Sequence, residues 1–189
     1  LPPDVIVKLN AYGWTNGSYT VVKFNVESDE TNSINAMIGL DIIPELNQEY
    51  GFDTVTYNSS AGVIRFHRGD QVNMGIKLLS HPLTSLYSFE WYDGYTVDED
   101  YWDWMNEGTL QPQYVSNTAD GPVTITSQDA IALSNGQSVD VYYALALGAD
   151  EDAMLENIAM AVEKYNFMIV STSDRIAENN LLTLEQNSP

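Results

Sequence analysis

The densest group of side chains that could bind a ligand lies between residues 87 and 104, where aromatic residues alternate with carboxylates. Aromatic rings offer broad apolar faces on which sugar rings can stack, and carboxylate oxygens accept hydrogen bonds from sugar hydroxyls. The pattern therefore predicts a polysaccharide-binding surface. The predicted contact residues are Trp91, Tyr92, Tyr95, Tyr101, Trp102 and Trp104. The alternative is a long loop that folds back, so that these aromatic side chains complete the core.

Carboxylates of the same stretch could hold a cation. Asp98, Asp100 and Asp103 offer oxygen atoms, which are the ligands that calcium prefers in proteins. Their spacing differs from that of an EF-hand loop, which requires a glycine at its sharp turn and a glutamate at its end. Calcium is therefore the one cofactor that the sequence predicts, with these three aspartates as its ligands.

Motifs for catalysis are absent from the sequence. The two histidines, His67 and His81, are not at a spacing typical of zinc ligands, and the chain contains no cysteine. It also lacks the Gly-x-Ser-x-Gly motif of serine hydrolases and a glycine-rich phosphate loop. Glu90 and Asp103 could form the carboxylate pair of a glycosidase only if the fold brings them together. We expect no catalytic residues, and a small glycoside hydrolase or peptidase is the alternative.

The charge of the chain excludes two classes of partner. Its 27 acidic residues against 7 lysines and arginines give a formal net charge of −20. Such a protein is repelled by the phosphates of nucleic acids and by anionic lipid headgroups. No apolar run approaches the roughly 20 residues that a membrane-spanning helix needs. We therefore expect neither nucleic-acid binding nor membrane insertion.

Most of the chain up to Gly148 alternates apolar and polar residues with a period of two, which is typical of half-buried β-strands. The clearest case is residues 139–147, where valine, tyrosine and leucine occupy every second position. Turn sequences such as Asn135-Gly136 separate the strands. The expected strands lie near residues 4–10, 22–26, 34–42, 53–57, 61–67, 72–78, 85–92, 121–126, 129–133 and 139–147. Many short strands with turns between them predict an all-β antiparallel β-sandwich.

One C-terminal amphipathic α-helix interrupts this pattern at about residues 150–170. Asp150 can cap its first turn, and the acidic residues that follow suit the positive end of the helix dipole. Apolar residues then recur at helical spacing on one face, namely Met154, Leu155, Ile158, Ala161, Val162 and Tyr165. This stripe is expected to pack on the sandwich.

Two segments of the sequence resemble known secreted proteins. Residues 181–189, Leu-Leu-Thr-Leu-Glu-Gln-Asn-Ser-Pro, resemble the lead-in to the Ig-like C-terminal sorting domain of bacterial proteins exported by the type IX secretion route. This resemblance implies that residues 1–178 form one module and that residues 179–189 are a linker to a sorting domain outside the chain. The start, Leu1-Pro2-Pro3, has no initiator methionine and is expected to lie within a longer protein.

A second resemblance covers roughly residues 20–165. It is carried by residues 133–148, Leu-Ser-Asn-Gly-Gln-Ser-Val-Asp-Val-Tyr-Tyr-Ala-Leu-Ala-Leu-Gly, by residues 38–41, Ile-Gly-Leu-Asp, and by residues 75–80, Gly-Ile-Lys-Leu-Leu-Ser. These segments resemble the β-rich accessory module that lies upstream of the sorting domain in secreted proteins such as subtilisin-like peptidases. The same pattern suggests Asp41, Asn47 and Asp53 as an alternative set of metal ligands.

Together these observations predict a non-catalytic accessory module of a secreted or cell-surface multidomain protein. The resemblance implies upstream and downstream domains of the same chain as its partners, and the aromatic stretch predicts polysaccharide as its ligand. A purely structural spacer between a catalytic domain and the sorting tail is the alternative.

Overall fold

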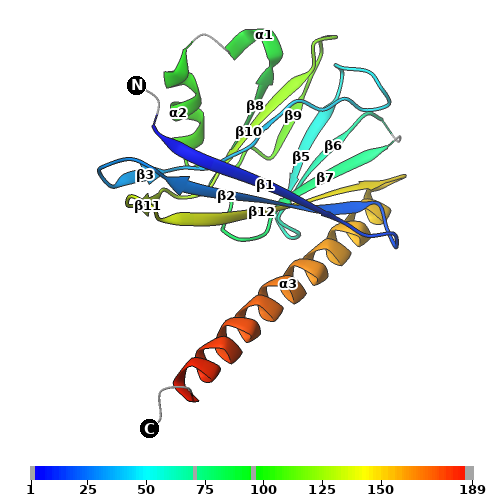
Figure 1. Cartoon of the computed structure of the whole chain (residues 1–189). Helices are drawn as coiled ribbons and strands as arrows, with labels where there is room; N and C mark the ends of the chain where they lie inside the picture. The colour runs from blue at the N-terminus through cyan, green and yellow to red at the C-terminus, as the bar shows by residue number, and fades with distance from the viewer. Residues whose placement is uncertain (1–2, 70–71, 95–96, 186–189) are drawn as a thin grey trace.

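The computed structural model describes residues 3–69, 72–94 and 97–185 (Figure 1). Within these residues the strands pair antiparallel, and the largest sheet contains seven of them in the order β1-β2-β12-β7-β6-β5-β9. Their bounds are Val5–Gly13 (β1), Tyr19–Ser28 (β2), Thr54–Asn58 (β5), Val63–His67 (β6), Asn73–Leu78 (β7), Gln113–Val115 (β9) and Ser138–Gly148 (β12). The predicted all-β sandwich is therefore confirmed.

A smaller sheet covers one face of the large sheet. It consists of β4 (Asp41–Ile42), β10 (Pro122–Ser127) and β8 (Ser85–Glu90), in that order, and a two-stranded sheet joins β11 (Ile131–Leu133) to β3 (Ile34–Ala36). The main core lies between the large and the small sheet. It contains Phe66, Ile76, Val141 and Tyr143 of the large sheet with Leu86 and Ile42 of the small sheet.

The opposite face of the large sheet is covered by α3 (Glu151–Glu185). Met154, Ile158 and Ala161 pack there against two valines, one of β2 and one of β6, and two alanines of β12. The close approach requires Gly75 of β7, because a Cβ atom at this position would overlap the side chain of Met154. The predicted apolar stripe of the helix thus packs on the sheet as expected, with these three residues buried and Leu155, Val162 and Tyr165 half-buried.

α3 is longer than the predicted helix of about residues 150–170. It continues to Glu185 and includes most of the predicted linker 179–189, while residues 186–189 lie outside the described residues. Between Gly148 and Pro189 the sequence contains neither glycine nor proline, so no residue with a strong helix-ending tendency interrupts it. Figure 1 shows the second half of α3 extending away from the sheets.

Two helices follow β8, where the sequence suggests a loop or a single turn. They are α1 (Trp91–Gly94) and α2 (Asp98–Asn106), and α2 packs on the outer face of the small sheet. The molecule is therefore layered in the order α3, large sheet, small sheet, α2 (Figure 1).

Candidate aromatic binding site

The aromatic residues between positions 87 and 104 fall into two sets, one packed against the small sheet and one exposed to solvent. The first set packs on the small sheet: the ring centroid of Trp104 lies 4.3 Å from that of Phe89 and 5.8 Å from that of Tyr87. Tyr101 contacts Trp104 edge to face, with the centroids 5.6 Å apart. Three of the predicted ligand-binding residues, Trp91, Tyr101 and Trp104, are thus half-buried and pack against the core cluster of Phe89, Val123 and Ile125.

The second set faces solvent. The side chain of Tyr92 is 79% exposed and that of Trp102 is 54% exposed. Trp102 lines an open depression together with Val97, Asp98 and Glu99 of α2 and its N-cap. Tyr95, another predicted contact residue, lies outside the described residues.

Trp91 and Tyr92 lie beside an aromatic residue that the sequence analysis does not single out, Tyr50. The rings of Trp91 and Tyr92 are nearly parallel, with 6.2 Å between centroids and an interplanar angle of 16°. Tyr50 contacts Trp91 edge to face at 5.9 Å. We refer to Tyr50, Trp91 and Tyr92 as the aromatic corner. Its sequence signal is the segment 50–53, Tyr-Gly-Phe-Asp, which places aromatic residues next to an acid as the predicted stretch does.

Tyr50 is also held by a carboxylate. Its hydroxyl donates a hydrogen bond to Oε2 of Glu45 at 3.2 Å, and this bond raises the pKa of the Tyr50 phenol. The exposed carboxylate of Glu49 adjoins it in the sequence. The aromatic corner therefore combines apolar ring faces with hydrogen-bond acceptors, which is the combination that recognises the faces and hydroxyls of a sugar.

The loop that carries Tyr50 has a strained backbone. Asn47, Gln48 and Phe52 have φ angles of 56°, 63° and 54°, in the left-handed region that residues other than glycine rarely adopt. Each such residue costs on the order of 1 kcal/mol and persists only where its surroundings fix it. The position of Tyr50 therefore depends on contacts outside the loop.

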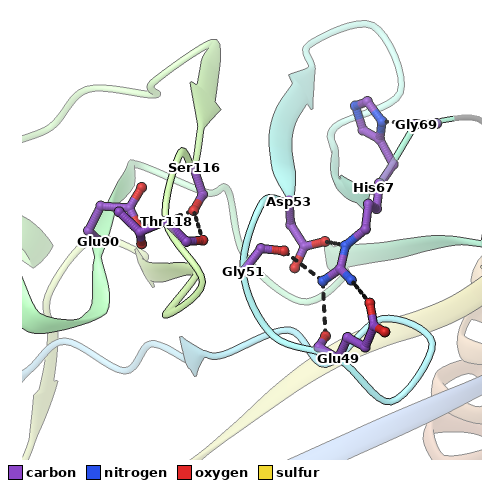
Figure 2. Close-up of polar contacts among 9 residues, drawn as sticks. Glu49, Gly51, Asp53, His67, Gly69, Glu90, Ser116 and Thr118 are labelled. Atoms are coloured by element: carbon purple, nitrogen blue, oxygen red, sulfur yellow. Dashed lines mark hydrogen bonds and ion pairs between the residues drawn. The ribbon is translucent and has the colours of Figure 1, made fainter.

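Arg68, directly after β6, supplies these contacts (Figure 2). Its guanidinium donates to the carboxylate of Glu49 at 2.8 Å, to the carbonyl oxygens of Glu49 and Gly51 at 3.0 and 2.6 Å, and to Oδ1 of Asp53 at 2.9 Å. The planar guanidinium can satisfy several acceptors at once, so one side chain fixes both ends of the segment 49–53.

Asp53, the last residue of this segment, is fully buried. Its Oδ2 atom has no hydrogen-bond partner among the residues that the structure describes. Burial raises the pKa of the carboxyl group, and the contact with Arg68 partly opposes that rise. Removal from water penalises a charged carboxylate unless its partner stays in place. Asp53 therefore depends on Arg68 for stability.

Glu90, the last residue of β8, fixes the other side of the aromatic corner (Figure 2). Its carboxylate accepts hydrogen bonds from Ser116 Oγ at 3.0 Å, Thr118 Oγ1 at 2.7 Å and the amide of Asn117 at 3.1 Å. The carbonyl oxygen of Thr118 in turn accepts from the amide of Phe52 at 2.9 Å. Glu90 therefore ties the segment 116–118 to the loop of Tyr50, while Asp103 is an exposed residue of α2.

The predicted calcium ligands lie on α2. Asp98 and Asp100 belong to its first turn, where negative charge is favourable, and Oδ2 of Asp100 accepts from the amide of Val97 at 3.2 Å. Across the part of the chain that the structure describes, no three acidic, histidine or cysteine side chains are grouped so as to hold a metal ion. In the alternative set, Asp41 accepts from the hydroxyl of Tyr101 and Asp53 from Arg68. Calcium stays a prediction from the sequence.

The comparisons with known proteins add little to this geometry. No family model matches the sequence, and no curated protein is similar to it. Among solved structures, the chain is similar to an Escherichia coli K12 protein described as a "putative aldose 1-epimerase", with 8% identity and a TM-score of 0.37. The match covers 77% of this chain and 66% of that protein's length. A similarity of this size assigns neither a fold family nor a function.

None of the described helices is both long and apolar enough to cross a membrane.

Proposed function

We propose that the protein is a non-catalytic accessory module that binds polysaccharide through the aromatic corner, with Trp102 as a second contact. The observation that carries this proposal is the pair of stacked rings, Trp91 and Tyr92, presented next to Tyr50 on a fixed support. Arg68 and Glu90 hold the two segments that form the corner. A surface that is ordered before binding loses less conformational entropy when the ligand arrives.

The charge of the protein narrows the class of ligand. At a net charge of −20, an anionic polysaccharide would be repelled from the surface, and the exposed carboxylates beside the corner would add to the repulsion. Neutral sugars instead donate hydrogen bonds from their hydroxyls to such carboxylates. The proposed ligand is therefore a neutral polysaccharide.

The setting of the module is proposed from the sequence resemblance. It would belong to a secreted or cell-surface protein of the type IX route, between an upstream catalytic domain and a downstream sorting domain. The module would then hold the parent protein on its polysaccharide.

The proposal is tested by titrating tryptophan fluorescence with a panel of neutral and anionic polysaccharides. We expect a neutral polysaccharide to shift the emission and the anionic ones to leave it unchanged. Replacing Tyr92 with alanine (Tyr92→Ala) should weaken the binding about tenfold, as expected when a central aromatic contact is removed. Trp102→Ala should weaken it to a smaller extent.

The matched control is Phe167→Ala, because this side chain is 71% exposed on α3, an element separate from the corner. It should bind as the unmodified protein does. Equal losses for Phe167→Ala and Tyr92→Ala, or no response of the unmodified protein to any polysaccharide, would overturn the proposal.

A structural spacer is the second candidate function, and the length of α3 favours it. A helix of 35 residues is roughly 50 Å long, and its second half extends away from the sheets (Figure 1). Such a helix would separate the module from a following domain. A protein that responds to no polysaccharide would leave this candidate in place.

A further inference from the structure

β1 forms an edge of the large sheet and is paired with β2 alone among the described residues (Figure 1). It is nine residues long, and its side chains from Ile6 to Tyr12 are exposed. The opposite edge strand, β9, has only three residues. A long, exposed edge strand offers a row of backbone groups with which another strand can pair.

The hydrogen bonds to β2 show which residues of β1 point their backbone outward. In an antiparallel ladder, successive residues direct their N–H and C=O groups alternately to the two sides. The amide of Asp29 donates to the carbonyl oxygen of Asp4 at 3.0 Å, so even-numbered residues face β2. The bond from Thr20 Oγ1 to the carbonyl oxygen of Tyr12 agrees. The outward-facing residues are Val5, Val7, Leu9, Ala11 and Gly13.

This pattern is self-complementary. If a second copy of β1 lies antiparallel with the two Leu9 residues opposite each other, Val7 is opposite Ala11 and Val5 is opposite Gly13. Every outward-facing residue then meets another outward-facing residue, and all their backbone groups are paired. The arrangement has a two-fold axis through Leu9, which is the symmetry of a closed dimer.

The side chains suit the same arrangement. Val7 and Leu9 are 56% and 60% exposed and lie on the face of the sheet that carries Phe24 and Val26. Opposite residues in a ladder lie close enough for their side chains to pack, so the second copy would cover this apolar stripe. Val7 and Leu9 of one copy would therefore pack against the apolar side chains of β1 in the second copy.

The charge distribution also favours a second copy at this edge. Residues 5–13 include one charged residue, Lys8, and no carboxylate, although the whole chain carries a net charge of −20. Two copies would repel each other least where they approach through this strand. The register places Lys8 opposite Asn10 of the second copy, so the two lysines are not directly opposed.

We propose that two copies of the protein associate through β1 across a two-fold axis at Leu9, so that their seven-stranded sheets form one continuous sheet. This association is independent of the proposed polysaccharide binding. That binding uses other segments of the chain, those around Tyr50 and Trp91, and no residue of β1.

The first test is analytical ultracentrifugation of the complete 189-residue chain over a range of concentrations. As the concentration rises, the measured mass of the unmodified protein should approach twice the monomer mass of 21.1 kDa. Leu9→Asp places two carboxylates directly opposite each other and should weaken the dimer about a hundredfold. Asn10→Asp adds the same charge one residue away but opposite Lys8 of the second copy, and should leave the dimer as strong or stronger.

The second test fixes the register, and it uses the absence of cysteine from the chain. Opposite residues of a hydrogen-bonded antiparallel pair have Cα atoms about 5.5 Å apart, within the range of a disulfide. Mild oxidation should therefore cross-link the Leu9→Cys variant into a dimer and leave the Val5→Cys variant uncross-linked. A monomer at every concentration, a dimer that Leu9→Asp does not weaken, or equal cross-linking of the two cysteine variants would overturn the proposal.

Discussion

The aromatic side chains of α2 lie close in the sequence to Trp91 and Tyr92 of the aromatic corner, yet the contacts that hold them differ from those that hold Tyr50, the third residue of that corner. Tyr101 and Trp104 are one helical turn apart and pack on the small sheet, where Trp104 contacts Phe89 and Tyr87 and Tyr101 contacts Trp104. Trp102 lies between them in the sequence and faces solvent on the other side of the helix. The helical period thus separates packing residues from candidate contact residues, because neighbours in a helix point about 100° apart.

The aromatic corner shares this apolar support through Trp91, which packs against the same core cluster. Its Tyr50 loop contains three non-glycine residues with positive φ and is fixed by polar contacts from Arg68. The packed set therefore depends on apolar burial, whereas the Tyr50 side of the corner depends on the ion pair between Arg68 and the buried Asp53. Substitutions that remove one kind of support at a time will separate the two.

The largest effect is expected for Arg68→Met. This change leaves the fully buried Asp53 without its cation and frees the loop 49–51, so we expect the free energy of unfolding to fall by about 4 kcal/mol. Urea denaturation followed by circular dichroism measures it. A double variant, Arg68→Met with Asp53→Leu, removes both charges and should recover part of the loss. A fall of less than about 1 kcal/mol for Arg68→Met would contradict the dependence of the corner on this pair.

The next effect in size distinguishes the two faces of α2. Trp104→Ala removes a ring that packs on Phe89 and Tyr87, and should lower the free energy of unfolding by about 3 kcal/mol. Trp102→Ala removes an exposed ring and should change it by no more than about 0.5 kcal/mol. The same urea experiment measures both. Similar losses for the two variants would contradict the assignment of Trp104 to the packed face of α2 and of Trp102 to its exposed face.

The length and residue pattern of each element decide how far the sequence predicts its structure. Strands such as β12 are predictable because a period of two over residues 139–147 has no helical counterpart. α2 is not, since residues 98–106 are rich in aspartate and aromatic residues, which have modest helix propensities. β9 contains three residues, too few to show an alternation.

The candidate site is less predictable than the fold. The sequence identifies Trp91, Tyr92 and Trp102, but Tyr50 is some forty residues away and reaches Trp91 only through a loop with positive φ angles. The contacts of Arg68 with Asp53 and Glu49 are likewise tertiary. Neither residue spacing nor periodicity records contacts of this kind, because they depend on how the loops pack.

The smallest expected effect is a dependence of stability on pH, which distinguishes the buried carboxyl of Asp53 from the apolar packing of Trp104. Burial raises the folded-state pKa of Asp53 above its ordinary value of 3.8, so the folded protein holds this proton more tightly than the unfolded chain does. The contribution of Asp53 to stability is therefore complete below that ordinary value and is lost as the pH rises through the folded-state pKa. Asp53→Asn cannot ionise at this position. Relative to that of the unmodified protein, its free energy of unfolding should therefore increase, meaning greater relative stability, as the pH is raised from about 4 to about 6.

Subtracting the two proteins removes the contribution of the other carboxylates, which they share. Trp104→Ala is the control, because a packed indole does not titrate and its deficit should be the same at both pH values. A difference between Asp53→Asn and the unmodified protein that stays constant with pH would show that the carboxyl of Asp53 titrates alike in the folded and unfolded states. The corner would then rest on the geometry of the Arg68 hydrogen bonds rather than on a buried charge.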